Sequence, residues 1–119
     1  MKPGTEGTLL RIFLDGSDHL GDRPMYEAIV LSARKNGLAG ATVLRGGLGF
    51  GRSNRLHSER LLRVSQDLPL IVEIVDSDQR IQSFLPVLED LMHDSGMVTM
   101  EKVQVFEYRQ TTNKSNQEI

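Results

Sequence analysis

The residues best suited to chemistry concentrate in one segment, residues 42–62, which reads TVLRGGLGFGRSNRLHSERLL. Four glycines, four arginines and a histidine lie there between two apolar runs. Glycines let backbone N–H groups converge on a phosphate, and arginines donate paired hydrogen bonds to it. An aromatic ring in such a segment can stack on a base or pack against a neighbouring subunit. The segment thus supplies the candidate ligand-binding residues Arg45, Gly46, Gly47, Gly49, Phe50, Gly51, Arg52, Arg55 and His57.

The same segment nearly matches the phosphate-cradling P-loop between Gly46 and Ser53. However, Arg52 stands where the P-loop has lysine, and the residues behind it, NRLHSE, do not begin a convincing helix. The chain is also short for the parallel sheet of a P-loop protein. Arg52 likewise breaks the dinucleotide-binding pattern G-x-G-x-x-G. The sequence therefore does not predict nucleotide hydrolysis.

Two interpretations of the segment remain, an anion-binding loop and a glycine-rich connection whose arginines face water. Its length favours a function, because hairpin connections usually have about two to five residues and this one approaches about twenty. Glycine loses the most backbone freedom on ordering, so a glycine-rich loop is costly to order. A ligand that binds the ordered loop better therefore shifts the equilibrium between its disordered and ordered states. We therefore predict a switch in which residues 46–58 become ordered on binding and Phe50 is exposed in only one state.

Other titratable residues give weaker signals. Four of them crowd the loop after the first apolar run, Asp15, Asp18, His19 and Asp22. They have no defined metal-ligand spacing, which favours a solvated loop with Asp22 near a helix N-terminus. The arginines around His57 favour its neutral form, which can donate one hydrogen bond to a ligand, although an ordinary surface histidine fits as well. His93 is expected to be structural, near the end of a helix.

Composition narrows the class of protein. The 119 residues suit one domain, and 39% hydrophobic with 25% charged residues indicates a folded core. Fourteen Lys and Arg against sixteen Asp and Glu give a net charge of −2, which argues against nucleic-acid binding. The absence of cysteine excludes disulfides, thiolate metal sites and cysteine nucleophiles. With no apolar run of membrane-spanning length and no signal-like N-terminus, we expect a cytoplasmic protein.

Hydrophobic periodicity predicts six elements in the order β-α-β-β-α-β. The first helix opens at Pro24 and stops at Asn36-Gly37, and Asp76 with Gln79 is a capping pair for the second helix. Pro86 should kink or divide this second helix, which ends at Ser95-Gly96. The strands are expected at 8–14, 41–44, 68–76 and 102–109, while 56–66 fits either a short helix or an outer strand.

This order predicts an α+β, ferredoxin-like βαββαβ sandwich, with an antiparallel four-stranded sheet and two helices on one face. Residues 8–109 form the domain, with a flexible segment at 1–7 and a disordered tail at 110–119. The uncovered sheet face carries Leu, Val and Phe, so we predict a cyclic trimer that buries it.

The residues also resemble a known family. PMYEAIVLSARKNGLAGATVLRGGLGFG, RSNRLHSERLLRVSQDLPLIVEIVD and GMVTMEKVQVF are similar to the PII-like group catalogued as domain of unknown function 190, over about residues 8 to 108. The resemblance implies ferredoxin-like protomers in a trimer, with small effectors in clefts between subunits. The glycine- and basic-rich loop that PII proteins have before their last strand is reduced to HDSGMVTMEK, which adds Gly96 and Val98 to the candidate ligand-binding residues. The modification tyrosine of PII proteins is not recognisable, since the chain has only Tyr26 and Tyr108.

The resemblance also implies a function. It points to a non-enzymatic regulator that binds a small anionic effector, with an adenine nucleotide as one candidate. The loop near residues 45–60 would then signal to a partner such as a membrane transporter or channel. The alternative is a small enzyme on the same fold that uses His57 or the Asp18/His19 pair, because the fold itself does not choose between activities.

Overall fold

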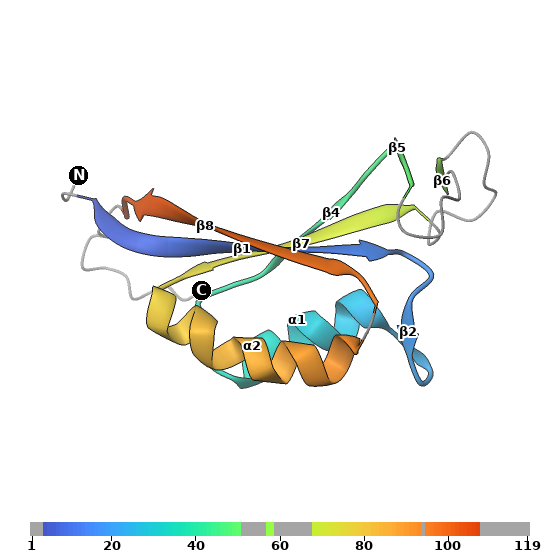
Figure 1. Ribbon diagram of the computed structural model, residues 1–119, viewed down its shortest axis with the longest axis horizontal. Coiled ribbons are helices and arrows are strands. Elements are labelled where there is room, and N and C mark those ends of the chain that lie inside the picture. Colours follow the sequence, from blue (N-terminus) through green and yellow to red (C-terminus); the bar gives the residue numbers. More distant parts are fainter. Residues whose placement is uncertain (1–3, 51–56, 59–67, 94, 108–119) are drawn as a thin grey trace, which may run out of the picture.

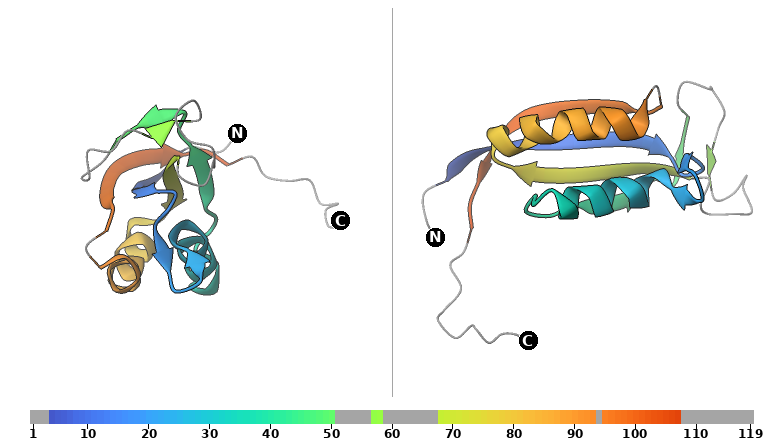
Figure 2. Two further views of the ribbon diagram at one scale, coloured as in Figure 1. Left: turned by 90° about the vertical axis from the view of Figure 1, so that its right-hand side faces the viewer. Right: turned by 90° about the horizontal axis from the view of Figure 1, so that it is seen from below.

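The computed structural model, which describes residues 4–50, 57–58, 68–93 and 95–107, has the predicted β-α-β-β-α-β core (Figure 1). Its strands form one antiparallel sheet in the order β4-β7-β1-β8, and both helices cover the same face of it (Figure 2). The ferredoxin-like α+β prediction is thus confirmed. The core elements are β1 (Thr5–Asp15), α1 (Met25–Lys35), β4 (Thr42–Arg45), β7 (Pro69–Asp76), α2 (Asp78–Met92) and β8 (Met97–Val105).

The core lies between the sheet and the helices because buried and more exposed side chains alternate along both central strands. Every second residue of β1 and β7 is buried under the helices. Each helix packs an apolar stripe, with residues at helical spacing, against these strand residues. The register places Leu10 opposite Ile74 and Ile12 opposite Val72, so these side chains share one face. The buried core comprises Leu10, Ile12, Leu14, Met25, Ile29, Ala33, Leu70, Val72, Ile74, Ile81, Phe84, Leu88 and Met92.

The other face of the sheet, the open face, is covered by no element in the described part of the chain. At its centre Arg11 of β1 forms ion pairs with Glu73 of β7 at 2.8 Å and Glu101 of β8 at 2.7 Å. Hydrogen bonding to Glu73, supported by the charges of both glutamates, raises the pKa of Arg11 against a smaller opposing effect of desolvation. Around these charges the face carries exposed apolar side chains, among them Leu44, Val75 and Met97.

Several element boundaries differ from the predicted ones. Thr5–Gly7, expected in a flexible segment, extend β1 because they pair with Val103–Val105. β8 begins at Met97, five residues before the predicted start at 102, because Met97 already pairs with Phe13. Among the described residues, no helix is long and apolar enough to cross a membrane.

The second helix corrects the predicted N-cap and excludes a division at Pro86. Its N-cap is Ser77, whose hydroxyl accepts a hydrogen bond from the Arg80 N–H at 3.3 Å, and not Asp76. The Asp76 carboxylate is engaged elsewhere, with the backbone N–H groups of Ala39 and Ser77. Pro86 does not divide α2, which runs unbroken from Asp78 to Met92. The proline is exposed, so its ring lies on the outer side of the helix.

Candidate functional site

The candidate residues gather at one end of the sheet, the loop end. β1 and β4 finish there while β7 and β8 begin there, since the register pairs Asp15 with Pro69, Arg45 with Leu70 and Phe13 with Met97. α1 starts at this end and α2 finishes there (Figure 1). The antiparallel topology therefore brings segments near residues 16–24, 45–50 and 93–98 to the same side of the molecule.

Arg45 to Phe50 form the glycine segment, which continues from β4. The Gly46 N–H donates to the Pro69 carbonyl at 2.8 Å, and β5 (Leu48–Gly49) pairs with β6 (His57–Ser58). A Cβ atom at Gly46 would lie 3.0 Å from Pro69 Cγ, and one at Gly49 would lie 3.3 Å away. These two glycines thus permit close packing on Pro69, whereas Gly47 faces open space.

The side chains of the glycine segment are presented to solvent. Leu48 is 64% exposed and Phe50 is 68% exposed, the two highest values among the large apolar residues described. Arg45 lies on the helix side of the sheet, where its guanidinium carbon is 5.7 Å from the centre of the Tyr26 ring. A cation–π contact of this kind contributes about 0.5–1 kcal/mol at an exposed site. It holds a positive charge at the base of the segment.

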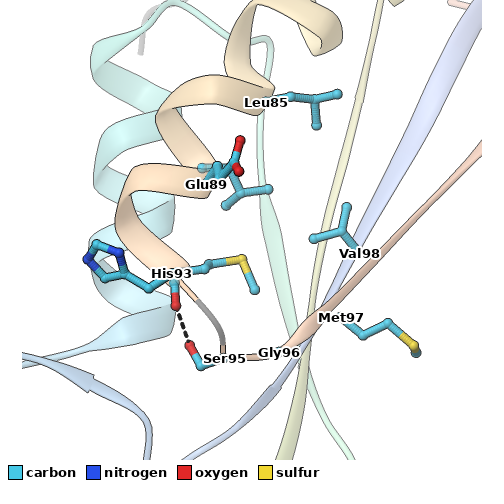
Figure 3. A pocket seen from close by; sticks show the side chains of 9 residues that line it. Leu85, Glu89, His93, Ser95, Gly96, Met97 and Val98 are labelled. Carbon is cyan, nitrogen blue, oxygen red and sulfur yellow. Dashed lines mark hydrogen bonds between the residues drawn. The ribbon is translucent and has the colours of Figure 1, made fainter.

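A cavity of about 280 Å³ opens between the last turns of α2 and the start of β8 (Figure 3). Its walls are mainly apolar, and Val98 projects from β8 toward the helix while Met97 points to the other side of the strand (Figure 3). Glu89, His93 and Ser95 supply polar groups. The cavity is lined by Leu85, Leu88, Glu89, Met92, His93, Ser95, Gly96, Met97 and Val98.

The turn below this cavity needs glycine at residue 96. Gly96 has φ 79°, and a Cβ atom there would lie 2.8 Å from the Phe13 carbonyl oxygen and collide with Met92 Cε. Next to it the Ser95 hydroxyl donates to the Met92 carbonyl at 2.8 Å. His93 is the C-cap of α2 with φ 53°, so it lies just beyond the helix instead of on its last turn.

The structure brings the predicted ligand residues to the same end but not to the same cavity. Arg45 ends β4 and Gly46, Gly47, Gly49 and Phe50 follow it, while Gly96 directly precedes β8 and Val98 lies at its start. β4 and β8 are the two outer strands, separated by β7 and β1. Gly51, Arg52, Arg55 and Arg60 lie outside the described residues, and of His57 only its place in β6, opposite Gly49, is described. Within one protomer these groups do not form a single site.

The sequence did not single out the α2 wall of the cavity. Leu85, Leu88 and Met92 belong to the apolar stripe of the helix, whose ordinary interpretation is core packing. Leu88 and Met92 do pack in the core and also line the cavity, so no sequence signal distinguished this second role. Tyr26 was likewise named only as one of the two tyrosines of the chain, not as a contact for Arg45.

The aspartates of the first loop organise that loop. The Asp18 carboxylate accepts from the Asp15 N–H at 3.1 Å, and the Asp15 carboxylate accepts from the Ser17 N–H and hydroxyl. His19 Nδ1 lies 2.5 Å from the Ser17 carbonyl oxygen, at the start of the small ladder between β2 (His19–Leu20) and β3 (Arg23–Pro24). No cluster of three or more metal-ligating side chains occurs among the described residues. Asp22 does not cap α1, whose N-cap is Pro24 without a side-chain hydrogen bond.

A second cavity, of about 290 Å³, lies at the opposite end, between the end of α1 and the first turns of α2. Arg80 crosses this region, donating from Nη1 to the Gly37 carbonyl at 2.8 Å. The lining residues are Asn36, Leu38, Ser77, Gln79, Arg80, Ser83 and Phe84. No predicted ligand residue of the described part of the chain lines this cavity.

Comparison with protein families gives one match that spans the domain. A model of the family DUF190, described as Uncharacterized ACR, matches residues 7–105. A UPF0166 protein of Aquifex aeolicus is 33% identical over 97 residues, which is 82% of this chain and 90% of the relative. A UPF0166 protein of Methanocaldococcus jannaschii is 30% identical over 98 residues, with the same coverage of 82% and 90%.

Solved structures with the same fold come from PII-like proteins. CPII, a nitrogen regulatory PII-like protein from Thiomonas intermedia K12 bound to ADP, AMP and bicarbonate, matches with a TM-score of 0.69 at 16% identity. The match covers 86% of this chain and 90% of CPII. The GlnK–ATP complex of B. subtilis matches with a TM-score of 0.55 at 13% identity and covers 82% of each chain. At these identities the likeness shows the fold.

Proposed function

The chain belongs to the DUF190 family, and we propose that it is a PII-like regulatory protein: a homotrimer that binds a small anionic effector in clefts between subunits. The proposal rests on one observation above all. The cavity at Gly96–Val98 and the glycine segment at Arg45–Phe50 lie at the same end of the sheet but on its two opposite outer strands. A ring of copies brings the β8 side of one protomer to the β4 side of the next, and this unites the two halves.

The size and chemistry of the cavity support a site completed by a neighbour. Ligand pockets usually enclose roughly 300–1,000 Å³, and the cavity of one protomer, at about 280 Å³, lies just below that range. Its walls are mainly apolar, and the described residues that line it include no arginine or lysine for a phosphate. Arg45 and the backbone N–H groups of the glycine segment supply what is missing.

An adenine nucleotide is our first candidate for the effector. An apolar wall such as Leu85 and Val98 suits a purine ring, while Arg45 and the glycine segment suit phosphates. The fold relatives point the same way, because CPII was solved with ADP and AMP and GlnK with ATP.

The open face of the sheet supports the trimer. It leaves Leu44 46% exposed, Val75 40% exposed and Met97 56% exposed, which is a patch that assembly would remove from water. The ion pairs of Arg11 with Glu73 and Glu101 already offset one of the two carboxylate charges at its centre. A cyclic trimer that turns three such faces toward its axis buries them together.

We propose that the glycine segment is the surface through which the protein contacts its partner. Leu48 and Phe50 are exposed apolar side chains on a glycine-rich backbone, which gives a partner something to bind. We propose that effector binding orders residues 46–58, of which 51–56 lie outside the described residues, and that this changes the presentation of Phe50 to a partner such as a membrane transporter or channel.

Calorimetry with ADP, AMP and ATP tests the proposal, with adenosine and inorganic phosphate as controls. We expect saturable nucleotide binding that raises the unfolding temperature without product formation, in a protein that light scattering shows to be a trimer. Absence of binding to all three nucleotides would remove the adenine nucleotide, and turnover of a bound nucleotide would support the enzyme alternative instead.

A further inference from the structure

We infer that the cavity of about 290 Å³ opposite the loop end, which we name the far-end cavity, binds a small oxyanion through Arg80. The ligand class is a compact molecule with a phosphoryl or carboxylate group, because both groups match the planar fork of a guanidinium. The described residues that line this cavity have no member in common with those of the cavity beside β8. The inference is therefore independent of the trimer and of the effector in the proposed function.

Polar side chains at helical spacing form one wall of the far-end cavity. Gln79, Arg80 and Ser83 lie in the first turns of α2 and line it. Residues three and four positions apart share one face of a helix, so Ser83 lies beside both of the others. The sequence predicted Gln79 as the capping partner of Asp76, yet the N-cap is Ser77, and the Gln79 amide forms no hydrogen bond with the described residues. Its amide donors are therefore available to a ligand.

Arg80 is the only charged residue among the described residues that line the far-end cavity. Its Nη1 donates to the Gly37 carbonyl oxygen at 2.8 Å, which ties the guanidinium to the end of α1. The other N–H groups of this guanidinium form no hydrogen bond or ion pair with the described residues. One bond thus fixes the head group and leaves donors for a ligand, and such preorganisation reduces the entropy lost on binding.

The two carboxylates close to Arg80 in the sequence are engaged with other partners. Asp76 accepts hydrogen bonds from the backbone N–H groups of Ala39 at 2.9 Å and Ser77 at 2.7 Å. Asp78 accepts from the Thr8 hydroxyl at 2.9 Å. Neither carboxylate lines the far-end cavity, so neither occupies the position of an anionic ligand.

The remaining surroundings also suit a small anion. Arg34 and Lys35, in the last turn of α1, precede the lining residue Asn36, so positive charge gathers here although the whole chain has a net charge of −2. Phe84, which is 2% exposed, and the half-buried Leu38 are the apolar members of the lining. Apolar surface beside a guanidinium excludes water and strengthens its hydrogen bonds.

The volume and the hydroxyl groups restrict the ligand further. Ligand pockets usually enclose roughly 300–1,000 Å³, so a cavity of about 290 Å³ suits a compact molecule and not a nucleotide. The Ser77 hydroxyl accepts from the Arg80 backbone N–H at 3.3 Å, which leaves its proton to donate. The Ser83 hydroxyl forms no hydrogen bond with the described residues. Arg80 and these two hydroxyls together supply donors for the oxygens of one oxyanion.

An NMR titration of the wild-type protein, labelled with ¹⁵N, tests the site. Inorganic phosphate and acetate are added separately, and chloride keeps the ionic strength constant. We expect saturable shifts of the Gln79 and Asn36 side-chain amides and of the Arg80 Nε–H, because these groups surround the far-end cavity. Tighter binding of phosphate identifies a phosphoryl group and tighter binding of acetate a carboxylate. If neither probe shifts these groups, the inference is overturned.

Two variants separate ligand binding from a purely structural role of Arg80. Arg80→Gln should weaken binding of the preferred probe about 10- to 150-fold, for one lost charge-assisted hydrogen bond. Arg23→Gln, which removes the same charge at the loop end, is the matched control and should keep the wild-type affinity. Because Arg80→Gln also loses the bond to Gly37, Ser83→Ala serves as the second variant. It should leave urea unfolding without ligand unchanged and weaken binding about 2- to 10-fold. Unchanged affinity in both variants would contradict the inference.

The position of the shifts separates this site from the effector cleft. Shifts confined to the glycine segment and Val98 would place the anion in the cleft and overturn the far-end site. We expect the far-end shifts to persist at a saturating concentration of ADP, and Arg80→Gln to keep the calorimetric affinity for ADP. Absence of nucleotide binding would remove the proposed effector and leave the far-end titration as the independent test of this site.

Discussion

Replacing Gly96 by alanine should destabilise the protein more than the same change at Gly37, although both glycines have φ 79°. At Gly37 the new Cβ atom meets nothing within 4 Å, so only backbone strain is added, about 1–2 kcal/mol. At Gly96 the Cβ atom would lie 2.8 Å from the backbone carbonyl oxygen of Phe13, the residue that forms the last pair of the β1–β8 ladder with Met97. Because that oxygen belongs to the backbone, overpacking adds about 1–3 kcal/mol.

Urea unfolding at one fixed protein concentration measures the difference directly. Both substitutions reduce the freedom of the unfolded chain equally, so this effect cancels in the comparison. We expect Gly96→Ala to lose about 1–3 kcal/mol more than Gly37→Ala. Gly40→Ala is the matched control, since its φ is not positive and its Cβ atom also meets open space; it should change the stability little. Equal losses at Gly96 and Gly37 would refute the close packing of the turn beside the cavity.

Four further predictions concern the ligand, the assembly, the loop and its output. Arg45→Ala should weaken nucleotide binding about 10- to 150-fold, for one lost charge-assisted hydrogen bond, while Arg34→Ala at the far end of α1 leaves the calorimetric affinity unchanged. Arg11→Ala should shift the light-scattering mass toward monomer, because Glu73 and Glu101 would face the subunit interface without their cation. Since the pKa of Arg11 is raised, the wild-type ion pairs are lost only at strongly alkaline pH. The mass of the wild-type protein should therefore show no titration step from Arg11 in the neutral range. Hydrogen exchange at residues 46–50 and 57–58 should slow when nucleotide is added. Full protection of these amides without ligand would mean that the loop is already ordered and does not act as a switch. Phe50→Ala should preserve nucleotide affinity and reduce capture of the partner by at least about tenfold, because the ring is 68% exposed; unchanged capture would remove Phe50 from the partner surface.

The fold could be predicted because each element carries its own local signal. The alternation of Leu10, Ile12 and Leu14 predicts a strand with one buried face, and the stripe from Ile81 to Met92 predicts a helix above it. Element ends were less predictable. β8 begins at Met97 only because β1 is there to pair with it, and a polar Thr99 and Glu101 on the open face conceal the strand from periodicity. Ser77 and Asp76 are both good caps, and contacts with Ala39 decide which of them is used.

The candidate site was predictable in part. Glycine and arginine content pointed to residues 45–51, and the family resemblance added Gly96 and Val98. The sequence could not show that two of the glycines pack on Pro69, since this depends on the meeting of β4 and β7. Nor could it show that the two groups lie on opposite outer strands, because sheet order is a property of the whole fold. That separation is what points to a neighbour.

Mixed trimers of two binding-deficient variants test the shared cleft most directly. Arg45→Ala removes the cation of the site, and Val98→Asp places a carboxylate in its apolar wall, so ADP should bind weakly to either variant alone. In a mixed trimer, an Arg45→Ala protomer still offers an intact wall and its Val98→Asp neighbour an intact arginine. We predict that mixing restores tight ADP binding, with one site per mixed trimer. If mixing restores no binding although mixed trimers form, the effector does not bind between subunits as proposed.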